Sequence, residues 1–159
     1  MKLAEKQNQI CRQLAAFNSG SDRLVSLVEK AKVRRPLPPE SRIDANLVPG
    51  CLAKLWLVAE MRAGRCHFDC DSDSLIVKAV AGLLCDFYSD QPPGEILAIE
   101  PDFLGPLGIT QHLTPNRRNA LARVRDHIRH FAQAQGAAGP EESPPVSQPS
   151  PESAIIPGS

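Results

Sequence analysis

The first feature of the sequence that could do chemistry is a cysteine at the end of a proline-rich segment. Cys51 follows Pro49 and Gly50, and a run of strand-forming residues begins just after it. Gly50 has no side chain to block the approach of another protein. Thiolate is the reactive form of cysteine, and nearby positive charge favours it; Lys54 is the nearest cation in the sequence. Cys51 is therefore the candidate nucleophile, and burial as a small core residue is the alternative.

The other cysteines offer a weaker case for chemistry. The chain has five cysteines, an odd number without the spacing of a disulfide scaffold. Cys66 and Cys70 flank His67 and so suggest a metal site. On a strand, however, these two cysteines would stand about 13 Å apart, and His67 would point to the opposite face. We therefore expect no metal on this chain, and we expect both cysteines, like Cys11 and Cys85, to pack as small apolar residues.

Hydrolase and cofactor chemistry find little support in the sequence. A cysteine hydrolase needs a histidine base within hydrogen-bond reach of the thiol. His112 is a candidate by residue type, but no recognisable protease motif surrounds Cys51. The sequence also has no phosphate-binding glycine loop and no H-E-x-x-H motif. We expect no cofactor on this chain.

Charge and hydropathy argue against several classes of partner. Lys plus Arg and Asp plus Glu are balanced at 18 each, so no overall field attracts nucleic acid or an acidic membrane. The longest apolar runs fall well short of the roughly 20 residues that cross a bilayer. The first residues are polar and charged where a signal peptide would be apolar. We expect a cytoplasmic protein that binds neither nucleic acid nor membrane.

Hydrophobic periodicity predicts an α+β fold, in which a small antiparallel sheet formed by a hairpin is covered by helices. The hairpin is predicted over residues 52–71, with its turn at Arg62–Gly64. Because side chains alternate along a strand, Cys66, Phe68 and Cys70 share the predicted inner face.

Helices are predicted on both sides of this hairpin. Ser21 is the predicted N-cap of the second of two N-terminal helices, and Thr114 with Pro115 is predicted to start the last helix. Residues 34–50 contain four prolines, which predicts a long irregular loop that ends next to Cys51. The remaining predicted elements are an apolar helix after Asp71–Ser74 and short helical turns at 93–98 and 101–107.

Composition divides the chain into two parts. Residues 1–135 are long enough for one domain with its own core. Residues 136–159 hold six of the fifteen prolines and no Lys or Arg. Such a segment cannot bury enough apolar surface to offset the entropy of ordering. We predict a single domain over residues 1–135 and a disordered Pro-rich tail over residues 136–159.

Three segments, in order, resemble motifs of the SufE family, which also includes CsdE. Val48–Leu57 resembles V-x-G-C-x-S-x-V-W, Asp71–Lys78 resembles D-S-D-A-x-I-V-K, and Gln111–Leu121 resembles H-L-S-P-S-R-x-N-G-L. Three ordered motifs are much more specific than any one of them. The resemblance covers about residues 21–131.

The resemblance implies a SufE-like fold and a sulfur-acceptor function. A protein similar to this family accepts persulfide sulfur from a pyridoxal-phosphate cysteine desulfurase of the SufS or CsdA type and stimulates that enzyme. It then relays sulfur to an iron-sulfur scaffold of the SufBCD type. Transfer between thiols needs no cofactor on this chain, because the pyridoxal phosphate belongs to the desulfurase. CsdE-like service to another desulfurase and non-transferring regulation are the alternatives, and we expect a monomer or weak dimer.

The resemblance also implies roles for individual residues. Cys51 would be the persulfide acceptor, held in an apolar hollow at rest, and Arg117 would support its loop or its thiolate. Arg117, His112 and Asp73 match motif positions, and each has a structural alternative: a helix-surface residue, a partner for a loop carbonyl and a helix cap, respectively. The sequence departs from the family pattern at Ala53, Cys70, Ala79, Asn116 and Ala120, which leaves the choice of desulfurase open.

Overall fold

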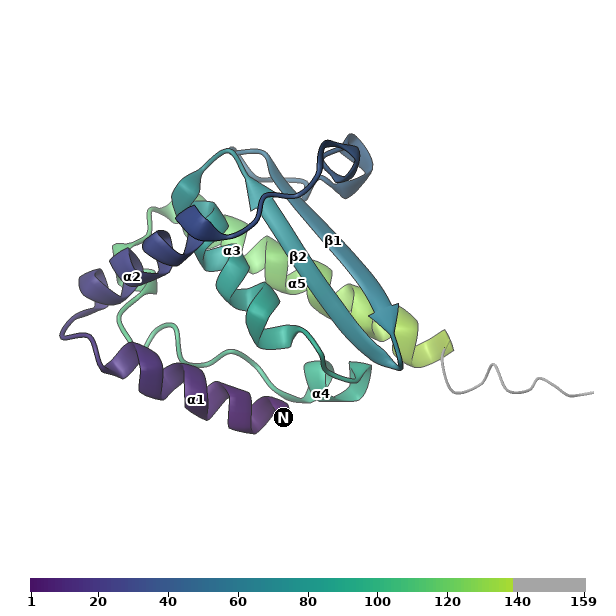
Figure 1. Cartoon of the computed structure of the whole chain (residues 1–159), viewed down its shortest axis with the longest axis horizontal. Helices are drawn as coiled ribbons and strands as arrows, with labels where there is room; N and C mark the ends of the chain where they lie inside the picture. Colours follow the sequence, from purple (N-terminus) through teal and green to yellow (C-terminus); the bar gives the residue numbers. More distant parts are fainter. Residues whose placement is uncertain (139–159) are drawn as a thin grey trace, which may run out of the picture.

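The computed structural model describes residues 1–138 and confirms the α+β fold (Figure 1). The predicted tail over residues 136–159 therefore lies outside the described residues, apart from three residues at the end of the last helix. None of the described helices combines the length and apolarity of a membrane-spanning segment. The elements are α1 (Leu3–Ala15), α2 (Gly20–Val33), β1 (Leu55–Arg62), β2 (Arg65–Ser72), α3 (Leu75–Tyr88), α4 (Pro93–Ala98) and α5 (Pro115–Ala138), with 3₁₀ turns η1 (Pro39–Ser41), η2 (Asp44–Asn46) and η3 (Thr110–His112).

The predicted hairpin is present as an antiparallel pair in which Leu55 faces Ser72 and Arg62 faces Arg65. Its two-residue turn places Ala63 and Gly64 at positive φ, 53° and 77°, which matches the twist of the strands on either side. The first strand begins at Leu55 rather than at residue 52, because residues 52–54 belong to the loop that carries Cys51. Cys66, Phe68 and Cys70 are buried, as predicted for the inner face.

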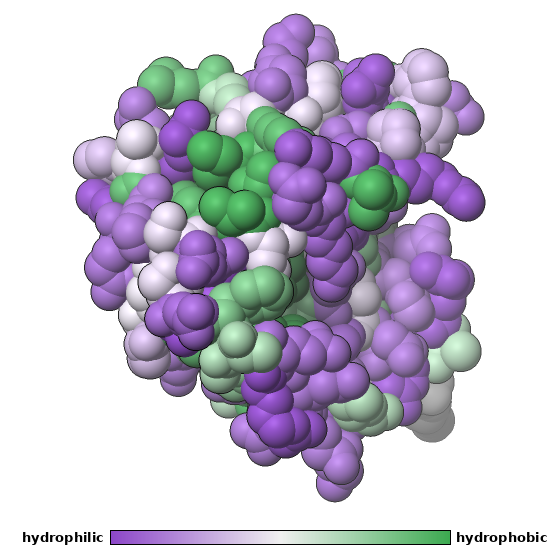
Figure 2. Space-filling view, turned by 60° about the vertical axis from the view of Figure 1, so that its left-hand side comes forward, coloured by the Kyte–Doolittle hydropathy of each residue, from purple (hydrophilic) through white to green (hydrophobic). Residues whose placement is uncertain are grey.

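Helix α3 is the centre of the core. It contacts β2 on one side and α2 on the other, and it also packs against α5 and α1 (Figure 1). Its residues are apolar around most of the helix, and ten of the fourteen are buried, as expected for a helix enclosed by neighbours. The surface is mostly hydrophilic in the view of Figure 2, with apolar residues gathered mainly in the upper half of that face.

The predicted N-cap of α2 is wrong. Ser19, not Ser21, caps α2: its Oγ accepts a hydrogen bond from the Asp22 backbone N at 3.1 Å. The helix starts two residues earlier than predicted because Gly20 already adopts helical geometry against Gly108. The predicted helical turn at 101–107 is present as a series of turns, in which the Leu107 N–H donates to the Phe103 carbonyl at 3.0 Å; Gly105 and Pro106 are poor helix formers and do not extend it.

The start of α2 and the loop before η3 meet backbone to backbone at Gly20 and Gly108. A methyl group on Gly20 would overlap the Gly108 carbonyl oxygen and would lie only 2.7 Å from the Gly108 carbonyl carbon. Gly108 itself has φ +75°, which favours glycine. Arg23 fastens the same junction by donating to the backbone carbonyls of Leu14, Phe17 and Leu107. This junction fixes the segment that leads into α5.

We expect Gly20→Ala to lower the free energy of unfolding by about 1–3 kcal/mol, because a rigid backbone must move to admit the methyl group. Gly94→Ala is the matched control, since an added Cβ there meets nothing within 4 Å. Urea unfolding followed by circular dichroism measures both. Equal midpoints for the two variants would show that the contact at Gly20 and Gly108 is not tight in solution.

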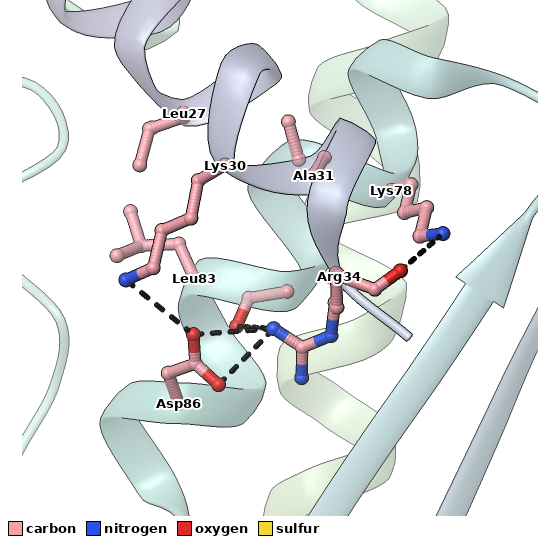
Figure 3. A pocket seen from close by; sticks show the side chains of 9 residues that line it. Leu27, Lys30, Ala31, Arg34, Lys78, Leu83 and Asp86 are labelled. Carbon is pink, nitrogen blue, oxygen red and sulfur yellow. Dashed lines mark hydrogen bonds and ion pairs between the residues drawn. The ribbon is translucent and has the colours of Figure 1, made fainter. Parts of the chain in front are cut away.

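Arg34, just past the end of α2, joins three elements through its guanidinium, and Figure 3 shows its bond to Asp86 on α3. It donates to Asp69 on β2 at 3.0 Å, to Asp86 on α3 at 3.1 Å and to the Gly82 carbonyl at 3.4 Å. Burial alone would lower the pKa of Arg34, but Asp86 and the hydrogen bond to Asp69 raise it above its ordinary value. Gly82 leaves room for the guanidinium, since a Cβ at Gly82 would lie 2.9 Å from the Arg34 Nη1 atom.

The predicted long loop after Arg34 contains the turns η1 and η2 and runs beside the end of the hairpin where Trp56 pairs with Asp71. The buried Asp71 carboxylate holds it there: it accepts the Leu37 backbone N–H at 3.0 Å and pairs with Arg42 at 3.6 Å and Lys78 at 3.4 Å. The Arg42 guanidinium also lies 5.5 Å from the Trp56 ring centroid, within cation–π range. These contacts fix the position of the segment that leads to the Cys51 loop.

Candidate functional site

Cys51 lies in a short loop, residues 49–54, whose two ends are held together. Before the loop, the buried Val48 donates its backbone N–H to the Leu55 carbonyl at 2.8 Å. Leu47 and Trp56 form an antiparallel bridge just outside this bond. The loop is thus a closed excursion from the sheet, and Cys51 is half-buried in it. The neighbouring Leu52 side chain is 82% exposed.

Asp73 holds the far end of this loop. Its Oδ1 accepts the Lys54 backbone N–H at 3.0 Å, and its own N–H donates to the Lys54 carbonyl at 3.2 Å. Ser72 Oγ donates to the same carbonyl at 2.7 Å. The structural alternative of Asp73 as helix cap is wrong, because Ser74 Oγ caps α3 by accepting the Val77 N–H at 3.3 Å. The motif aspartate therefore ties the Cys51 loop to the start of α3.

Two residues of α5 reach the other end of the loop, at Gly50. Asn119 Nδ2 donates to the Gly50 carbonyl at 3.1 Å. The Arg123 guanidinium lies beside the Gly50 Cα: a Cβ there would be 3.1 Å from Nε and 3.2 Å from Cζ. Gly50 also has φ +83°, so a side chain at this position would be both strained and crowded. The backbone thus favours glycine before Cys51, and any side chain there would also press against Arg123.

The electrostatics of the Cys51 thiol combine two opposing influences. Burial raises its pKa above the ordinary value, and the positive charge of Arg123 pulls it back down. The sequence pointed to Lys54 as the nearest cation, but the charged group that lowers the Cys51 pKa comes from α5. At rest, therefore, the thiol is mostly protonated near neutral pH, which limits its reaction with oxidants.

A cavity of about 310 Å³ lies beside the loop, between the starts of α3 and α5. Arg117 lines it together with Leu52 and Ala53, the two residues that follow Cys51. Thr114 also lines it and caps α5, because its Oγ1 accepts the Arg117 backbone N–H at 3.3 Å. The remaining lining residues are Ser74, Val77, Asn116 and Ala120. Three of the five departures from the family motifs, Ala53, Asn116 and Ala120, thus lie in one cavity.

His112 stands apart from this group. It is exposed in η3, where its backbone N–H donates to the Ile109 carbonyl at 3.1 Å. Within residues 1–138 no hydrogen bond of the His112 side chain is found, and His112 does not line the cavity beside Cys51. The structure therefore brings Cys51, Asp73 and Arg117 to one loop and its cavity, and leaves His112 outside.

The other cysteines differ from Cys51 in burial. Cys66, Cys70 and Cys85 are fully buried, and Cys11 is partly buried in α1. Burial raises the pKa of Cys66 to about 11. Cys85 has a raised pKa because its thiol interacts with Cys70 and because it is buried. In the part of the chain that the structure describes, no three His, Cys, Asp or Glu side chains cluster as metal ligands would.

Sequence reasoning missed Asn119 and Arg123. Both face Gly50 because residues four apart lie on the same side of a helix. That spacing was visible in the sequence, but the contact of α5 with the Cys51 loop joins positions about seventy residues apart. No local pattern indicates which face of α5 meets the loop.

Comparison with known proteins shows the relatives of this chain. A family model described as SufE, Fe-S metabolism associated domain, matches residues 8–132. An uncharacterized SufE-like protein of Synechocystis is 31% identical over 102 residues, 64% of this chain and 64% of that protein. A chloroplastic and mitochondrial SufE-like protein 1 of Arabidopsis thaliana is 30% identical over 143 residues, 89% of this chain. The chain spans only 38% of that plant protein.

A solved structure shares the fold. The solution structure of a hypothetical protein from Thermus thermophilus superposes with a TM-score of 0.66. The match covers 83% of this chain and 96% of that protein at 21% sequence identity. At this identity the match supports the fold alone, and membership of the family rests on the family model over residues 8–132.

Proposed function

Because this chain belongs to the SufE family, whose model matches residues 8–132, we propose that it is a sulfur-acceptor protein for iron-sulfur cluster assembly. It takes persulfide sulfur on Cys51 from a pyridoxal-phosphate cysteine desulfurase, stimulates that enzyme and relays the sulfur to an assembly scaffold. The observation that supports this most is the Cys51 loop itself: a half-buried thiol beside an arginine, in a closed loop next to a cavity.

The proposed step is an exchange between sulfur atoms. The Cys51 thiolate attacks the terminal sulfur of the persulfide on the desulfurase, and a new S–S bond forms at Cys51 Sγ. The S–S bond of the donor breaks, and the donor cysteine leaves as a thiolate. The transferred sulfur keeps its proton, so charge and atoms balance and no external oxidant is needed. All cofactor chemistry takes place on the desulfurase.

In this proposal, docking of the desulfurase moves the middle of the Cys51 loop outward and exposes the thiol. Burial raises the pKa of the Cys51 thiol, and the loop keeps it partly covered. The loop is anchored at its ends, through Val48 and Lys54, while the residues between carry Cys51. Movement of the middle of the loop toward a partner would relieve the desolvation and increase the thiolate fraction.

The surface around Cys51 suits a protein partner. Leu52 is 82% exposed and Leu75, at the start of α3, is 40% exposed. Exposed apolar side chains next to a reactive group are typical of a contact surface. We infer that the desulfurase docks here and that the protein acts in the cytoplasm as a monomer or weak dimer.

Two alternatives remain distinct from the main proposal. CsdE-like service to a different desulfurase would use the same Cys51 chemistry, and competition between two desulfurases for binding separates it. A non-transferring regulator would dock on the desulfurase without accepting sulfur. The half-buried Cys51 thiol, with Arg123 opposing the effect of burial on its pKa, favours acceptance, because a docking surface alone needs no thiol with a cation beside it.

The experiment that tests the proposal follows sulfur from isotopically labelled cysteine. The chain is incubated with a cysteine desulfurase and labelled cysteine, separated without reductant and measured for bound label. We expect label on this chain that is released by dithiothreitol, and faster alanine formation by the desulfurase. Faster alanine formation without bound label would support the regulator instead.

A further inference from the structure

Two residues of α5, Asn119 and Arg123, contact the residue that precedes Cys51. Asn119 Nδ2 donates to the Gly50 carbonyl at 3.1 Å. The Arg123 guanidinium lies against the Gly50 Cα, where its Nε, Cζ and Nη2 atoms would lie 3.1–3.3 Å from an added Cβ. The loop is thereby held from α5 at Gly50 and from Asp73 at Lys54.

We propose that Arg123 and Asn119 are further working residues of the sulfur-acceptor site: Arg123 supplies positive charge to the Cys51 thiolate and its persulfide, and Asn119 positions the loop. This inference rests on the proposed function for the persulfide part only. The effect on the Cys51 thiolate is a property of the protein alone and is tested without a desulfurase.

Arg123 has its charge available for this role. On the same helix, Arg125 and Arg129 pair with Glu100 at 2.7 Å and 3.0 Å. Within residues 1–138 no carboxylate lies within ion-pair distance of Arg123. An arginine without an acidic partner, placed against a loop backbone, is suited to stabilise an anion that forms there.

The other charged groups around the loop occupy different places. Arg117 lines the cavity behind Leu52 and Ala53, and Asp73 accepts the backbone N–H of Lys54 at the far end of the loop. Arg123 is the charged group that acts against burial on the Cys51 thiol. A persulfide anion at Cys51 would carry the same negative charge one sulfur further out, and the same guanidinium would stabilise it.

The test measures the alkylation rate of Cys51 by iodoacetamide as a function of pH, in the full chain. Trypsin releases residues 43–54 as a peptide with Cys51 as its single cysteine, so mass spectrometry reads this thiol separately from the others. The variants are Arg123→Gln, Arg123→Lys and Asn119→Ala. Arg12→Gln, which removes an exposed positive charge on α1, is the matched control.

For Arg123→Gln we expect the midpoint of the alkylation profile to move to higher pH, because loss of positive charge raises the Cys51 pKa further. The rate near neutral pH should fall by roughly three- to tenfold. Arg123→Lys retains the positive charge, so its midpoint should lie between that of the wild type and that of Arg123→Gln. Arg12→Gln should match the wild type. Asn119→Ala should raise the plateau rate at high pH through greater exposure, and because exposure relieves desolvation it should move the midpoint to lower pH, opposite to Arg123→Gln.

Specific results would overturn the inference. An Arg123→Gln midpoint equal to that of Arg12→Gln would show that Arg123 does not stabilise the thiolate, whether or not sulfur transfer occurs. An unchanged plateau for Asn119→Ala would remove its positioning role. If Arg123→Gln fails to fold, Arg123→Met takes its place as the uncharged variant, and a midpoint equal to that of Arg12→Gln would equally contradict the role of charge at this position.

Discussion

Replacing Cys51 with serine is expected to lower the transfer of labelled sulfur to this chain by at least about 100-fold, because a serine hydroxyl is a far weaker nucleophile than a thiolate. Serine is close to cysteine in size, and Cys51 is half-buried rather than part of the core. The variant should therefore fold normally and still bind the desulfurase. Loss of label with retained binding is the expected signature of an acceptor.

Cys11→Ser is the matched control for that experiment. Cys11 is the other partly buried cysteine, in α1, whereas Cys66, Cys70 and Cys85 are fully buried. We expect Cys11→Ser to accept sulfur as the wild type does. Label retained on Cys51→Ser and lost from Cys11→Ser would move the acceptor role to α1.

Arg34→Ala is expected to have the largest effect on stability among the polar residues discussed. The change removes the donor shared by Asp69, Asp86 and the Gly82 carbonyl and leaves both carboxylates without this partner. The Arg34 side chain is only 19% exposed, but both carboxylates are partly solvated, which reduces the cost. We expect a loss of about 2–3 kcal/mol in the free energy of unfolding.

Arg35→Ala provides the comparison for Arg34→Ala, since it removes the same charge from the next residue, which is exposed. Urea unfolding of both variants should show a large midpoint shift for Arg34→Ala and a change within about 0.5 kcal/mol for Arg35→Ala. Similar shifts would mean that overall charge, rather than the link between α2, α3 and β2, sets the stability. High salt should diminish the Arg34 effect only in part, because that network is partly buried.

The sequence predicted the fold well where the signal is local. The alternation that buries Cys66, Phe68 and Cys70 was visible in the sequence, and so was the cap at Thr114. The turn was predicted at Arg62–Gly64 and is found at Ala63 and Gly64, since Arg62 pairs with Arg65. Each depends on the residue type and its immediate neighbours. The boundaries were less predictable, as the shift of the α2 cap from Ser21 to Ser19 shows.

The candidate site was only partly predictable, because its contacts join distant segments. Cys51 stood out through its neighbours, and the family motifs pointed to Arg117, Asp73 and His112. The bond from Asp73 to Lys54 and the approach of Arg123 to Gly50 depend on how α3 and α5 pack around the loop. Burial, which raises the Cys51 pKa, is likewise a property of the packed structure. Sequence pattern indicates which residue is reactive, but the packed structure determines which residues control it.

The central claim, that Cys51 receives persulfide sulfur, is tested most directly by peptide mass spectrometry after incubation with a cysteine desulfurase and cysteine. Free thiols and persulfides are alkylated before digestion, and the peptide of residues 43–54 is measured. We predict that this peptide gains the mass of one sulfur atom, at a rate that matches desulfurase turnover. An unmodified Cys51 peptide beside a stably bound, active desulfurase would contradict the acceptor function.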